Sequence, residues 1–416
     1  MTSQIRKAFR FIRRKLAKAW LDLHPSIKIV GITGSYGKTN TAKAVEAVLK
    51  NYFNVISTDI NLDTVYNLPL TLLKINNQTE VAVLEYGIDR KGEMTQHLGL
   101  VKPAVTIVTG ITPVHSDQNL LGSIEGIVKE KGKLLEALPS DGRAILNFDD
   151  SRVIKMAEKA GCPIISYGSS KFFDFYASNI KVTKKGTSFE VNFKENKKLI
   201  KKKINLQLLG EHFAQEAMAA LATARVLGVS LNDKKIYQSL EKLAPLSGRM
   251  SLEAGPKKSL LINDSLRANP ASTMAGLKTL SVINHNGPRI AVLGEMGELG
   301  QYQAQEHHRI GLFLAKLKNI DYLITLGPAT KKIVQGAIKG GLAKDKIFYT
   351  ESHQEVAKVL KKFLTPQTLW YLKGSRLKHL ERILLLLSEK KVDCEKISCH
   401  NYFHCSECDR VNQKHP

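Results

Sequence analysis

Apolar residues recur along this chain with two different spacings. Between residues 1 and 24 they return every three or four positions among many Lys and Arg residues, which predicts a basic amphipathic helix. From residue 27 onward they come as short β-branched runs separated by segments long enough for helices. This rhythm predicts a parallel α/β sheet with strands near residues 27–32, 81–84, 105–108, 144–146 and 163–167.

The predicted N-terminal helix has two interpretations. Basic residues surround an apolar stripe that consists of Ile5, Phe9, Ile12, Leu16, Trp20 and Leu23. We favour docking of this stripe on the protein's own core, which leaves the basic face in solvent. The alternative is that the helix lies on an anionic membrane surface or against a partner protein.

Residues 172–208 interrupt the rhythm, because polar and apolar positions alternate there and lysines are frequent. The alternation predicts an antiparallel hairpin attached to the sheet. We interpret the lysine-rich run at 197–203 as a solvated sheet edge rather than a nucleic-acid site, since lysines discourage edge pairing. Helical patterns return at 211–227 and 233–243. A second α/β series follows, with strands near 260–262, 289–293, 322–326, 347–349 and 368–372.

The composition is that of a globular protein with one unusual property, its charge. Of the 416 residues 43% are hydrophobic, and the length suits two or three domains. Lys and Arg number 62 against 38 Asp and Glu, so the net charge of +24 suits nucleotide phosphates, nucleic acid or an anionic membrane. We expect a cytoplasmic protein with reduced thiols, because no apolar run reaches 18 residues and no signal-peptide pattern occurs.

The strongest chemical signal lies between the first predicted strand and the helix after it. The sequence there reads GITGSYGKT, from residue 31 to residue 39. In such a loop, backbone N–H groups and a helix N-terminus hold phosphates, the Lys ammonium reaches the β- and γ-phosphates, and the Thr hydroxyl ligates Mg²⁺. The spacing departs from the general phosphate loop, which has Gly where Ile32 stands. We predict ATP binding by Gly34, Ser35, Tyr36, Gly37, Lys38 and Thr39.

The variant TGSYGKT resembles the loop of the Mur ligase family, and the resemblance extends over about residues 28–388. Glu85, in VLEYG, falls where that family has a strand-end Glu that binds Mg²⁺, a role that suits a hard-cation ligand. His115, in TPVHSD, resembles a His that helps to hold a second metal ion. Lys131, in KEKGKLL, falls where the family carries a carbamylated lysine that ligates metal. Taken in isolation, Lys131 would be interpreted as a solvated helix charge.

Further segments resemble the family's nucleotide contacts. Asn147, in LNFDD, matches an Asn that lies near the adenine, and Arg249, in GRM, matches an arginine that clamps phosphate. The segment NDSLRANPAS adds Asp264 to the predicted ATP site. In LLGEHFAQEAMAA the family's Asn is replaced by Glu216, which puts that nucleotide contact in doubt.

The C-terminal half resembles the MurF-type branch of the family in particular. Its signatures are VLGEMGELG at residues 292–300 and LKGSR at residues 372–376. The resemblance implies a second, Rossmann-like α/β domain that binds an amine substrate bearing a carboxylate, through charge-assisted hydrogen bonds. Helix capping and solvated charge are the structural alternative for the residues concerned, which are Asn269, Lys373, Ser375 and Arg376.

Two departures from the family bear on the substrate. Only the basic helix precedes the phosphate loop, whereas ligases of this type have an N-terminal domain that holds a UDP-sugar precursor. The segment STDINLDTVYNLPLTL, residues 57–72, also differs from the family's pattern. We expect a basic helix at 1–24, a central ATP-binding domain with a parallel sheet at 25–247, the Rossmann-like domain at 248–388 and a Cys/His-rich tail at 389–416.

The tail contains enough soft ligands for a structural zinc site. Tetrahedral Zn²⁺ takes Cys and His ligands, and His400 and His404 are alternates to the four cysteines. The predicted ligands are Cys394, Cys399, Cys405 and Cys408. A reduced, disordered tail is the main alternative, and redox chemistry is a third.

Together these features predict an ATP-dependent, ADP-forming ligase that joins a carboxylate to an amine through an acyl phosphate, in cell-wall peptide synthesis. Its partners are ATP with Mg²⁺, a carboxylate-bearing peptide precursor, and an amino acid or dipeptide. The predicted catalytic residues are Lys38, His115, Lys131 and Arg249. The alternatives are a folylpolyglutamate- or polymer-forming ligase of the same superfamily, a nucleic-acid-binding ATPase and an inactive scaffold. The two C-terminal signatures argue against the nucleic-acid ATPase, which leaves them unexplained.

Overall fold

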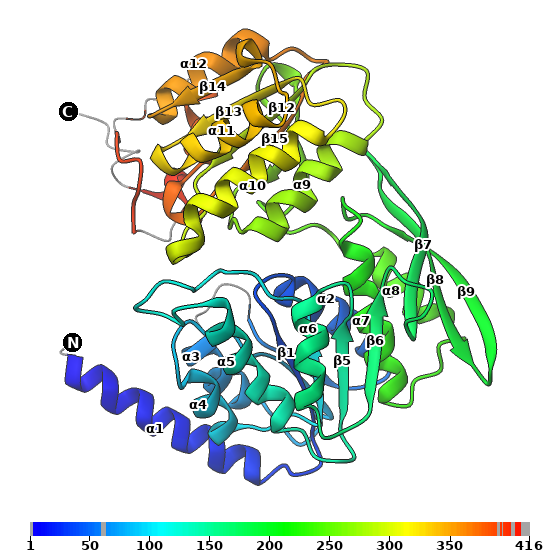
Figure 1. Ribbon diagram of the computed structural model, residues 1–416. Helices are drawn as coiled ribbons and strands as arrows, with labels where there is room; N and C mark the ends of the chain where they lie inside the picture. Colours follow the sequence, from blue (N-terminus) through cyan, green and yellow to red (C-terminus); the bar gives the residue numbers. More distant parts are fainter. Residues whose placement is uncertain (1–2, 60–63, 389–391, 393, 401–403, 409–416) are drawn as a thin grey trace. The chain divides into compact units, whose positions relative to one another are not determined.

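The computed structural model describes residues 3–59, 64–388, 392, 394–400 and 404–408, with side chains from residue 9 in the first helix (Figure 1). The chain forms two compact units, and each contains its own sheet. The first unit comprises Met1–Ile180, Ser188–Leu206 and His212–Leu243, and the second comprises Lys181–Thr187, Gln207–Glu211 and Ala244–Pro416.

The first unit is built on a nine-stranded sheet of order β2-β3-β1-β4-β5-β6-β7-β8-β9. The pairs from β2 to β6 are all parallel, and their strands are rich in Val, Ile and Leu that are buried along most of their length, as expected for strands covered on both faces. The strands are β1 (Lys28–Thr33), β2 (Val55–Ser57), β3 (Val81–Glu85), β4 (Val105–Val108), β5 (Arg143–Asn147), β6 (Ile164–Gly168), β7 (Phe175–Thr183), β8 (Gly186–Glu195) and β9 (Lys198–Leu206).

The carboxyl ends of four of these strands meet at one edge of the sheet. Register pairs Ile32 of β1 with Glu85 of β3, and Val108 of β4 with both Thr33 of β1 and Leu146 of β5. The loops after β1, β3, β4 and β5 therefore leave the sheet side by side, which is where open α/β sheets bind ligands. The predicted parallel sheet is confirmed, although β2, with three half-buried residues, gave no usable sequence signal.

Helices cover both faces of this sheet. One large apolar cluster gathers residues of α1 (Ser3–Asp22), α3 (Thr64–Leu72), α4 (Glu93–Leu100), α5 (Ile124–Glu136) and α6 (Ser151–Met156) against the sheet. A second group, α2 (Lys38–Leu49), α7 (Phe213–Val226) and α8 (Lys234–Glu241), packs together, with α2 in contact with β1, β2 and β3. Helices on both faces explain why the central strands carry apolar side chains in both directions.

Strands β7, β8 and β9 follow one another through connections of two residues, which can join only antiparallel neighbours. This confirms the predicted antiparallel extension of the sheet. Strand β9 is an edge strand of the sheet, and its lysines at 198, 201 and 203 are exposed. The lysine-rich run is thus a solvated edge, as predicted.

The second unit contains a six-stranded sheet of order β10-β11-β15-β12-β13-β14, parallel except for the β10–β11 pair. The predicted second α/β series is confirmed, and β10 is the strand that the sequence did not reveal. The strands are β10 (Ser251–Ala254), β11 (Leu260–Asp264), β12 (Arg289–Gly294), β13 (Tyr322–Leu326), β14 (Ile347–Thr350) and β15 (Leu369–Lys373). The helices are α9 (Pro270–Val282), α10 (Gln303–Lys316), α11 (Lys331–Lys339), α12 (His353–Phe363) and α13 (Arg382–Leu387).

The docking predicted for the N-terminal helix is wrong in one respect. Helix α1 forms, and it contacts α3 and α4, but Ala17 and Leu21 pack on the core, and from the apolar stripe Trp20 adds a hydrogen bond to the Ile75 carbonyl. Of the stripe, Phe9, Ile12 and Leu16 are each more than half exposed. The small Ala17 permits close approach to the core, so this face docks and most of the stripe does not. Among the residues described, no helix is long and apolar enough to cross a membrane.

Candidate functional site

The phosphate loop joins β1 to α2 through backbone that only glycine adopts easily. Gly34 has φ 148° and Gly37, the residue before α2, has φ 75°. A Cβ atom on Gly34 would lie 2.0 Å from the Thr109 hydroxyl oxygen, so the loop has no room for a side chain there. The four-residue turn therefore presents the N-terminus of α2 at the carboxyl edge of the sheet, where it attracts anions.

The reactive side chains of the loop are held by short contacts. The Lys38 ammonium donates to the Gly34 carbonyl at 2.7 Å, which folds the side chain back over the loop. The Thr39 hydroxyl donates to the Glu85 carboxylate at 3.2 Å. Glu85 is the last residue of β3 and is buried, with its own backbone N–H bonded to the Thr58 hydroxyl. The hydroxyl and carboxylate predicted as Mg²⁺ ligands are thus neighbours.

A second charged cluster lies beside the loop. The His115 Nδ1 atom is 2.8 Å from a carboxylate oxygen of Asp89, and His115 holds this position with a left-handed backbone, φ 70°. Desolvation would raise the pKa of Asp89, but the hydrogen bond and charge of His115, with Lys38 and Lys131, lower it to about 2. Asp89 is therefore an anion at neutral pH. His115 thus contacts a carboxylate that Lys38 of the phosphate loop and Lys131 also influence.

Lys131 is fully buried on α5, one helical turn after the apolar Ile127. Burial, and next the positive charge of Lys38, lower the pKa of Lys131 well below its usual value, against the pull of Asp89, Glu130 and Glu93. Solvated helix charge, its ordinary interpretation, is excluded by this burial. Burial and a neighbouring cation both disfavour the ammonium form of Lys131, so its proton is easier to remove than that of a solvated lysine.

Asn147 and the acidic residues after β5 lie at the same edge. The Asn147 amide donates to the Thr109 carbonyl at 2.8 Å and to Gln215 at 3.3 Å. Asp150 caps α6 and accepts from the Ile111 backbone N–H at 2.7 Å. Burial, with Asp150 and Asp149, raises the pKa of Tyr36 in the phosphate loop. These contacts fix the loop that follows β4 to the loop that follows β5.

Glu216, which replaces the family's Asn, faces the phosphate loop from α7. It is buried, and its carboxylate accepts from the Asn40 amide at 3.4 Å. A Cβ atom added to Gly37 would lie 3.8 Å from the same carboxylate. The substitution therefore puts a carboxylate, in place of a neutral amide, close to the loop.

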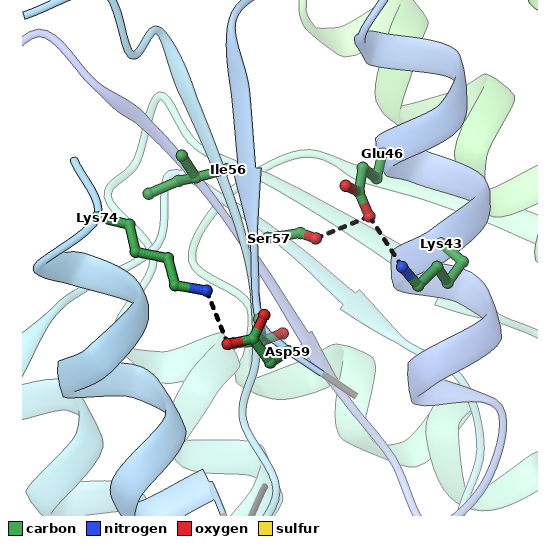
Figure 2. Close-up of a pocket in the computed structure, with 7 residues that line it drawn as sticks. Lys43, Glu46, Ile56, Ser57, Asp59 and Lys74 are labelled. Carbon is green, nitrogen blue, oxygen red and sulfur yellow. Dashed lines mark hydrogen bonds and ion pairs between the residues drawn. The ribbon is translucent and has the colours of Figure 1, made fainter. Parts of the chain in front are cut away.

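A pocket of about 410 Å³ lies next to this site, between α2 and the end of β2 (Figure 2). Its charged side chains are paired with one another: Lys43 with Glu46 at 3.6 Å, and Lys74 with Asp59 at 2.7 Å. Ser57 donates to Glu46 at 2.7 Å. The pocket includes the first residues of the segment whose sequence departs from the family. Two further positions of that departure, Asn61 and Asp63, fall outside the described residues, while Asn67 donates to the Asp59 carbonyl at 2.7 Å and Pro69 lies in α3.

The second unit contains a buried ion pair between two predicted site residues. The Lys373 ammonium, at the end of β15, donates to Asp264, at the end of β11, at 2.6 Å, and the Tyr371 hydroxyl donates to the same oxygen at 3.0 Å. Both charged side chains are at least nine-tenths buried. Burial raises the pKa of Asp264 and lowers that of Lys373, and their attraction opposes both shifts. Arg249 contributes positive charge to both groups.

The other predicted substrate residues of this unit have structural contacts. Asn269 caps α9: its side chain accepts from the Ser272 N–H at 2.9 Å, and Ser272 returns a bond in a capping box. The Ser375 N–H donates to the Glu295 carbonyl at 2.9 Å, and Arg376 lies 3.5 Å from Glu381. The capping role of Asn269 agrees with the structural alternative, in which these residues cap helices or are solvated charges. Arg376 instead forms an ion pair with Glu381.

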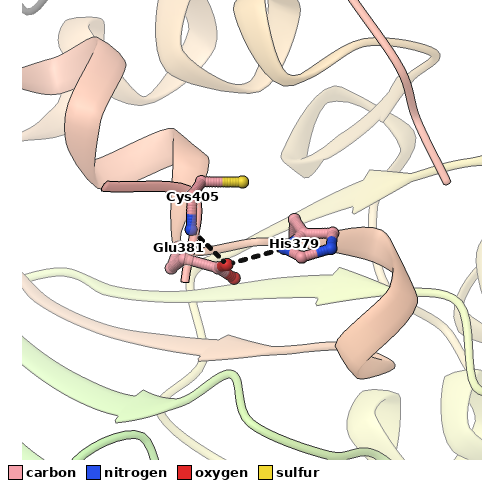
Figure 3. Close-up of side chains that lie close together, drawn as sticks. All are labelled: His379, Glu381 and Cys405. Carbon is pink, nitrogen blue, oxygen red and sulfur yellow. Dashed lines mark hydrogen bonds and ion pairs between the residues drawn. The ribbon is translucent and has the colours of Figure 1, made fainter. Parts of the chain in front are cut away.

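The zinc ligands predicted in the tail do not assemble. Among the described residues, the one group of three His, Cys, Asp or Glu side chains with ligand atoms within 4.8 Å of one another is His379, Glu381 and Cys405 (Figure 3). Of the predicted set Cys394, Cys399, Cys405 and Cys408, only Cys405 belongs to it. The tail is held instead by a cation: the Arg382 guanidinium lies 3.5 Å from the Cys405 sulfur and donates to the Cys394 and Lys396 carbonyls. Positive charge at the sulfur disfavours a divalent metal there.

The sequence missed three charged groups that the structure places in these clusters. Asp89 holds His115, and Glu130 accepts from the backbone N–H groups of Gly92 and Met94 at the start of α4. Glu381 accepts from His379 at 2.8 Å. Asp89 follows the strand-end Glu85 by four residues, so nearness to the sheet edge was an available signal. Glu130 and Glu381 gave no such signal. The partners of Glu130 are backbone groups far away in the sequence, and Glu381 lies in an irregular segment between two short helices.

Comparison with protein families gives two matches that together cover most of the chain. The Mur ligase middle domain matches residues 32–224, and the Mur ligase glutamate ligase domain matches residues 248–376. The chain belongs to the Mur ligase family. The UDP-N-acetylmuramoyl-tripeptide--D-alanyl-D-alanine ligase of Bacillus subtilis (strain 168) is 30% identical over 376 residues, which cover 90% of this chain and 79% of that relative. The ligase of the same name from Escherichia coli (strain K12) is 30% identical, covering 76% and 68%.

Solved Mur ligases have the same fold. MurF from Acinetobacter baumannii superposes with a TM-score of 0.81 at 28% identity, covering 92% of this chain and 81% of that one. MurF from Thermotoga maritima, solved with ADP, gives a TM-score of 0.76 at 24% identity, covering 91% and 83%, and shows the fold alone. The family resemblance and the two-domain α/β fold predicted from the sequence are confirmed. This Mur ligase is an enzyme of the class of its curated relatives, the ATP-dependent ligases that join an acid to an amino acid or peptide.

The buried Asp264–Lys373 pair generates a prediction about stability. Asp264→Ala leaves the Lys373 ammonium buried without its partner, which should lower the free energy of unfolding by about 3 to 5 kcal/mol. Urea denaturation of both proteins measures the difference. Glu211→Ala is the control in the same unit, because its exposed pair with Lys278 should contribute only about 0 to 1 kcal/mol. Equal losses for the two variants would contradict the assignment.

The His379 cluster generates a prediction about pH. The Cys405 sulfur and then Glu381 raise the pKa of His379 to about 10. A histidine whose pKa is higher in the folded state stabilises that state. The stabilisation is complete below the pKa of the unfolded chain, about 6.5, and is lost as pH rises through the folded-state pKa of about 10. The difference in Tm between the unmodified protein and His379→Asn should therefore shrink between pH 6.5 and pH 10.5. Asn tolerates the left-handed backbone of this position, φ 45°. A difference that does not change with pH would mean that His379 is neutral.

Proposed function

We propose that this Mur ligase uses Mg²⁺-ATP to join the carboxylate of a UDP-linked muramoyl peptide to the amine of a dipeptide such as D-alanyl-D-alanine. The names of the relatives that are 30% identical support this choice of substrates. The observation that carries the proposal is the convergence of the phosphate loop, Glu85, the Asp89–His115 pair and Lys131 at one sheet edge.

The proposed reaction has two steps. The substrate carboxylate attacks the γ-phosphorus of ATP, which releases ADP and leaves an acyl phosphate. The amine then attacks the acyl carbon, so that an amide forms, inorganic phosphate leaves and the amine loses a proton. The N–H groups of Gly34 to Gly37 and the Lys38 ammonium bind the phosphate oxygens and stabilise the charge that grows on them. We propose Asn147 as a contact of the adenine.

The donor set beside the phosphate loop fits Mg²⁺. A hydroxyl and a carboxylate 3.2 Å apart, Thr39 and Glu85, are hard oxygen donors, and the His115 imidazole lies against the anionic Asp89. We propose that Thr39 and Glu85 hold one ion, and that His115 with carbamylated Lys131 holds another. When bound, Mg²⁺ neutralises negative charge on the phosphates.

Carbamylation of Lys131 would remove the electrostatic cost of burying a cation at this position. As an ammonium, Lys131 is a buried cation near the cation Lys38, and both burial and Lys38 disfavour its charge. The neutral amine attacks CO₂, forming an N–C bond and releasing one proton, and the product carries a negative charge. The change converts a repulsion between two cations into an attraction, and it supplies a carboxylate-like metal ligand.

We further propose that the second unit binds the amine substrate. Arg376 and Arg249 are its candidate cations for a substrate carboxylate or phosphate, since Arg presents paired donors to such groups. Lys373 and Asp264 would act as a positioning pair, because each is buried against the other at 2.6 Å. Ser375 would position its loop through its backbone bond to Glu295, and Asn269 would position its own through the cap that it forms on α9.

A coupled ligase assay tests the proposed reaction. ADP release should require both the UDP-linked muramoyl tripeptide and D-alanyl-D-alanine, and Lys38→Ala should reduce it by about a hundredfold or more, as for loss of a transition-state charge donor. Lys50→Ala, at the exposed end of the same helix, is the matched control and should keep full activity. ATP turnover that ignores the amine, or that nucleic acid stimulates, would refute the ligase reaction proposed.

Carbamylation can be tested without turnover. Protein incubated with ¹³C-bicarbonate should show a carbamate carbon signal by NMR that is absent from Lys131→Met. The same variant should lose about a hundredfold or more in ADP release. Lys129→Met, exposed on the same helix, is the control and should change neither measurement. A carbamate signal that persists in Lys131→Met would show that another lysine is modified.

A further inference from the structure

The exposed face of α1 is the largest concentration of unburied apolar side chains in the described part of the chain. Half of the large apolar residues that are exposed there fall between residues 9 and 23, while the others are scattered singly over the two units. These six are Phe9, Phe11, Ile12, Leu16, Trp20 and Leu23, with exposures of 38% to 71%. Apolar groups gathered on one surface mark an interaction site, whereas single ones are ordinary.

Four of these six apolar residues form a continuous stripe, and Phe11 lies outside it. At about 100° per residue, Phe9, Ile12, Leu16 and Trp20 fall within an arc of about 80° on the helix. Arg13 borders one side of this arc and Lys15 lies beyond the other. The Lys15 ammonium lies 4.7 Å from the centre of the Phe11 ring, close to the apolar surface. Long basic side chains beside an apolar stripe can bury their methylenes while the charge stays in water.

The face that adjoins the stripe fixes the helix to the first unit, and Trp20, at the edge of the stripe, contributes to it. Ala17 is fully buried in the apolar cluster beneath the helix, and Leu21 packs against it. The Trp20 indole donates to the Ile75 carbonyl at 2.8 Å, and the Arg10 guanidinium lies 4.3 Å from the centre of the Tyr66 ring. The stripe is therefore presented outward by a docked helix, which runs beside α3 and α4 (Figure 1).

Charge distinguishes between the possible occupants of this face. Helix α1 contains seven Lys or Arg residues and one acidic residue, Asp22, which pairs with Lys18. A second copy of the chain would bring the same cations against these, and like charges at an interface are repulsive. An anionic lipid bilayer offers both an apolar interior for the stripe and negative headgroups for the cations.

We propose that α1 is an interfacial helix that binds this ligase reversibly to anionic membrane. The helix lies in the plane of the headgroups with Phe9, Ile12 and Leu16 directed into the acyl region, and its cations contact lipid phosphates. It does not cross the bilayer, since α1 is not long and apolar enough to do so. The surface would hold the ligase at the bilayer without involving the phosphate loop.

Vesicle binding by the full chain tests this proposal. Purified protein should sediment with vesicles of phosphatidylcholine containing 30% phosphatidylglycerol at least tenfold better than with phosphatidylcholine alone, and 0.5 M NaCl should weaken the binding. Fluorescence gives an independent measurement. The chain has two tryptophans, of which Trp370 is fully buried, so a blue shift on binding reports on Trp20.

Matched variants separate specific from nonspecific adhesion. Ile12→Ser with Leu16→Ser should reduce vesicle binding at least tenfold, while Phe172→Ser with Leu199→Ser, which removes exposed apolar groups elsewhere, should not. Lys15→Gln with Lys18→Gln should weaken binding more than Lys184→Gln with Lys185→Gln, which carries the same net charge. ATP-dependent ligation in solution and the Tm should be unchanged in all four.

Three outcomes would overturn the proposal. The first is equal binding to anionic and neutral vesicles, or none to either. The second is retention of binding in the Ile12→Ser, Leu16→Ser protein at unchanged Tm. The third is concentration-dependent dimerisation in sedimentation velocity that the same double variant abolishes, which would assign the face to a second copy of the chain.

Discussion

The constraint on which the candidate site depends is the parallel pairing of β1 with β3 and β4. Parallel strands end at one edge, so the loop after β1, Glu85 at the end of β3 and Thr109 after β4 become neighbours whatever their distance in sequence. The backbone turns tightly at Gly34, where a Cβ atom would clash with Thr109, and this turn places the N-terminus of α2 at the same edge. Helices on both faces keep the strands in place, so the rigidity of the site comes from the core beneath it.

The site concentrates charge of both signs in little space. Lys38 and Lys131 repel each other, and Asp89, Glu130 and Glu93 oppose that repulsion. Such an arrangement suits a protein that binds a polyanion and divalent cations, because the bound groups complete the balance of charge. The second unit achieves its balance internally, because Asp264 and Lys373 pair in its interior. Arg382 and His379 hold the tail through the Cys405 sulfur and backbone carbonyls.

The net charge of +24 acquires a more specific meaning from the structure. Lysines on β9 protect an exposed sheet edge, and Lys38 belongs to the phosphate loop. The cations of α1 surround an apolar stripe that the protein itself does not cover. A basic composition alone does not distinguish these roles, because each depends on which neighbours a cation has. Their separation onto different surfaces lets one chain bind a nucleotide at one place and present a basic apolar face at another.

The sequence by itself determined the phosphate loop, the two α/β series, the antiparallel extension and the family, because these depend on local spacing and on motifs in a fixed order. It missed β2, which has only three residues, and β10, whose sequence SLEA contains no apolar run. It also misplaced the stripe of α1, since periodicity shows that a face exists and not what covers it. Only the tertiary structure decided that Lys131 is buried beside Lys38, that Asp89 holds His115, and that Cys405 meets His379 and Glu381 rather than three other cysteines. Each of these facts is a contact between segments distant in sequence, and such contacts are set by packing.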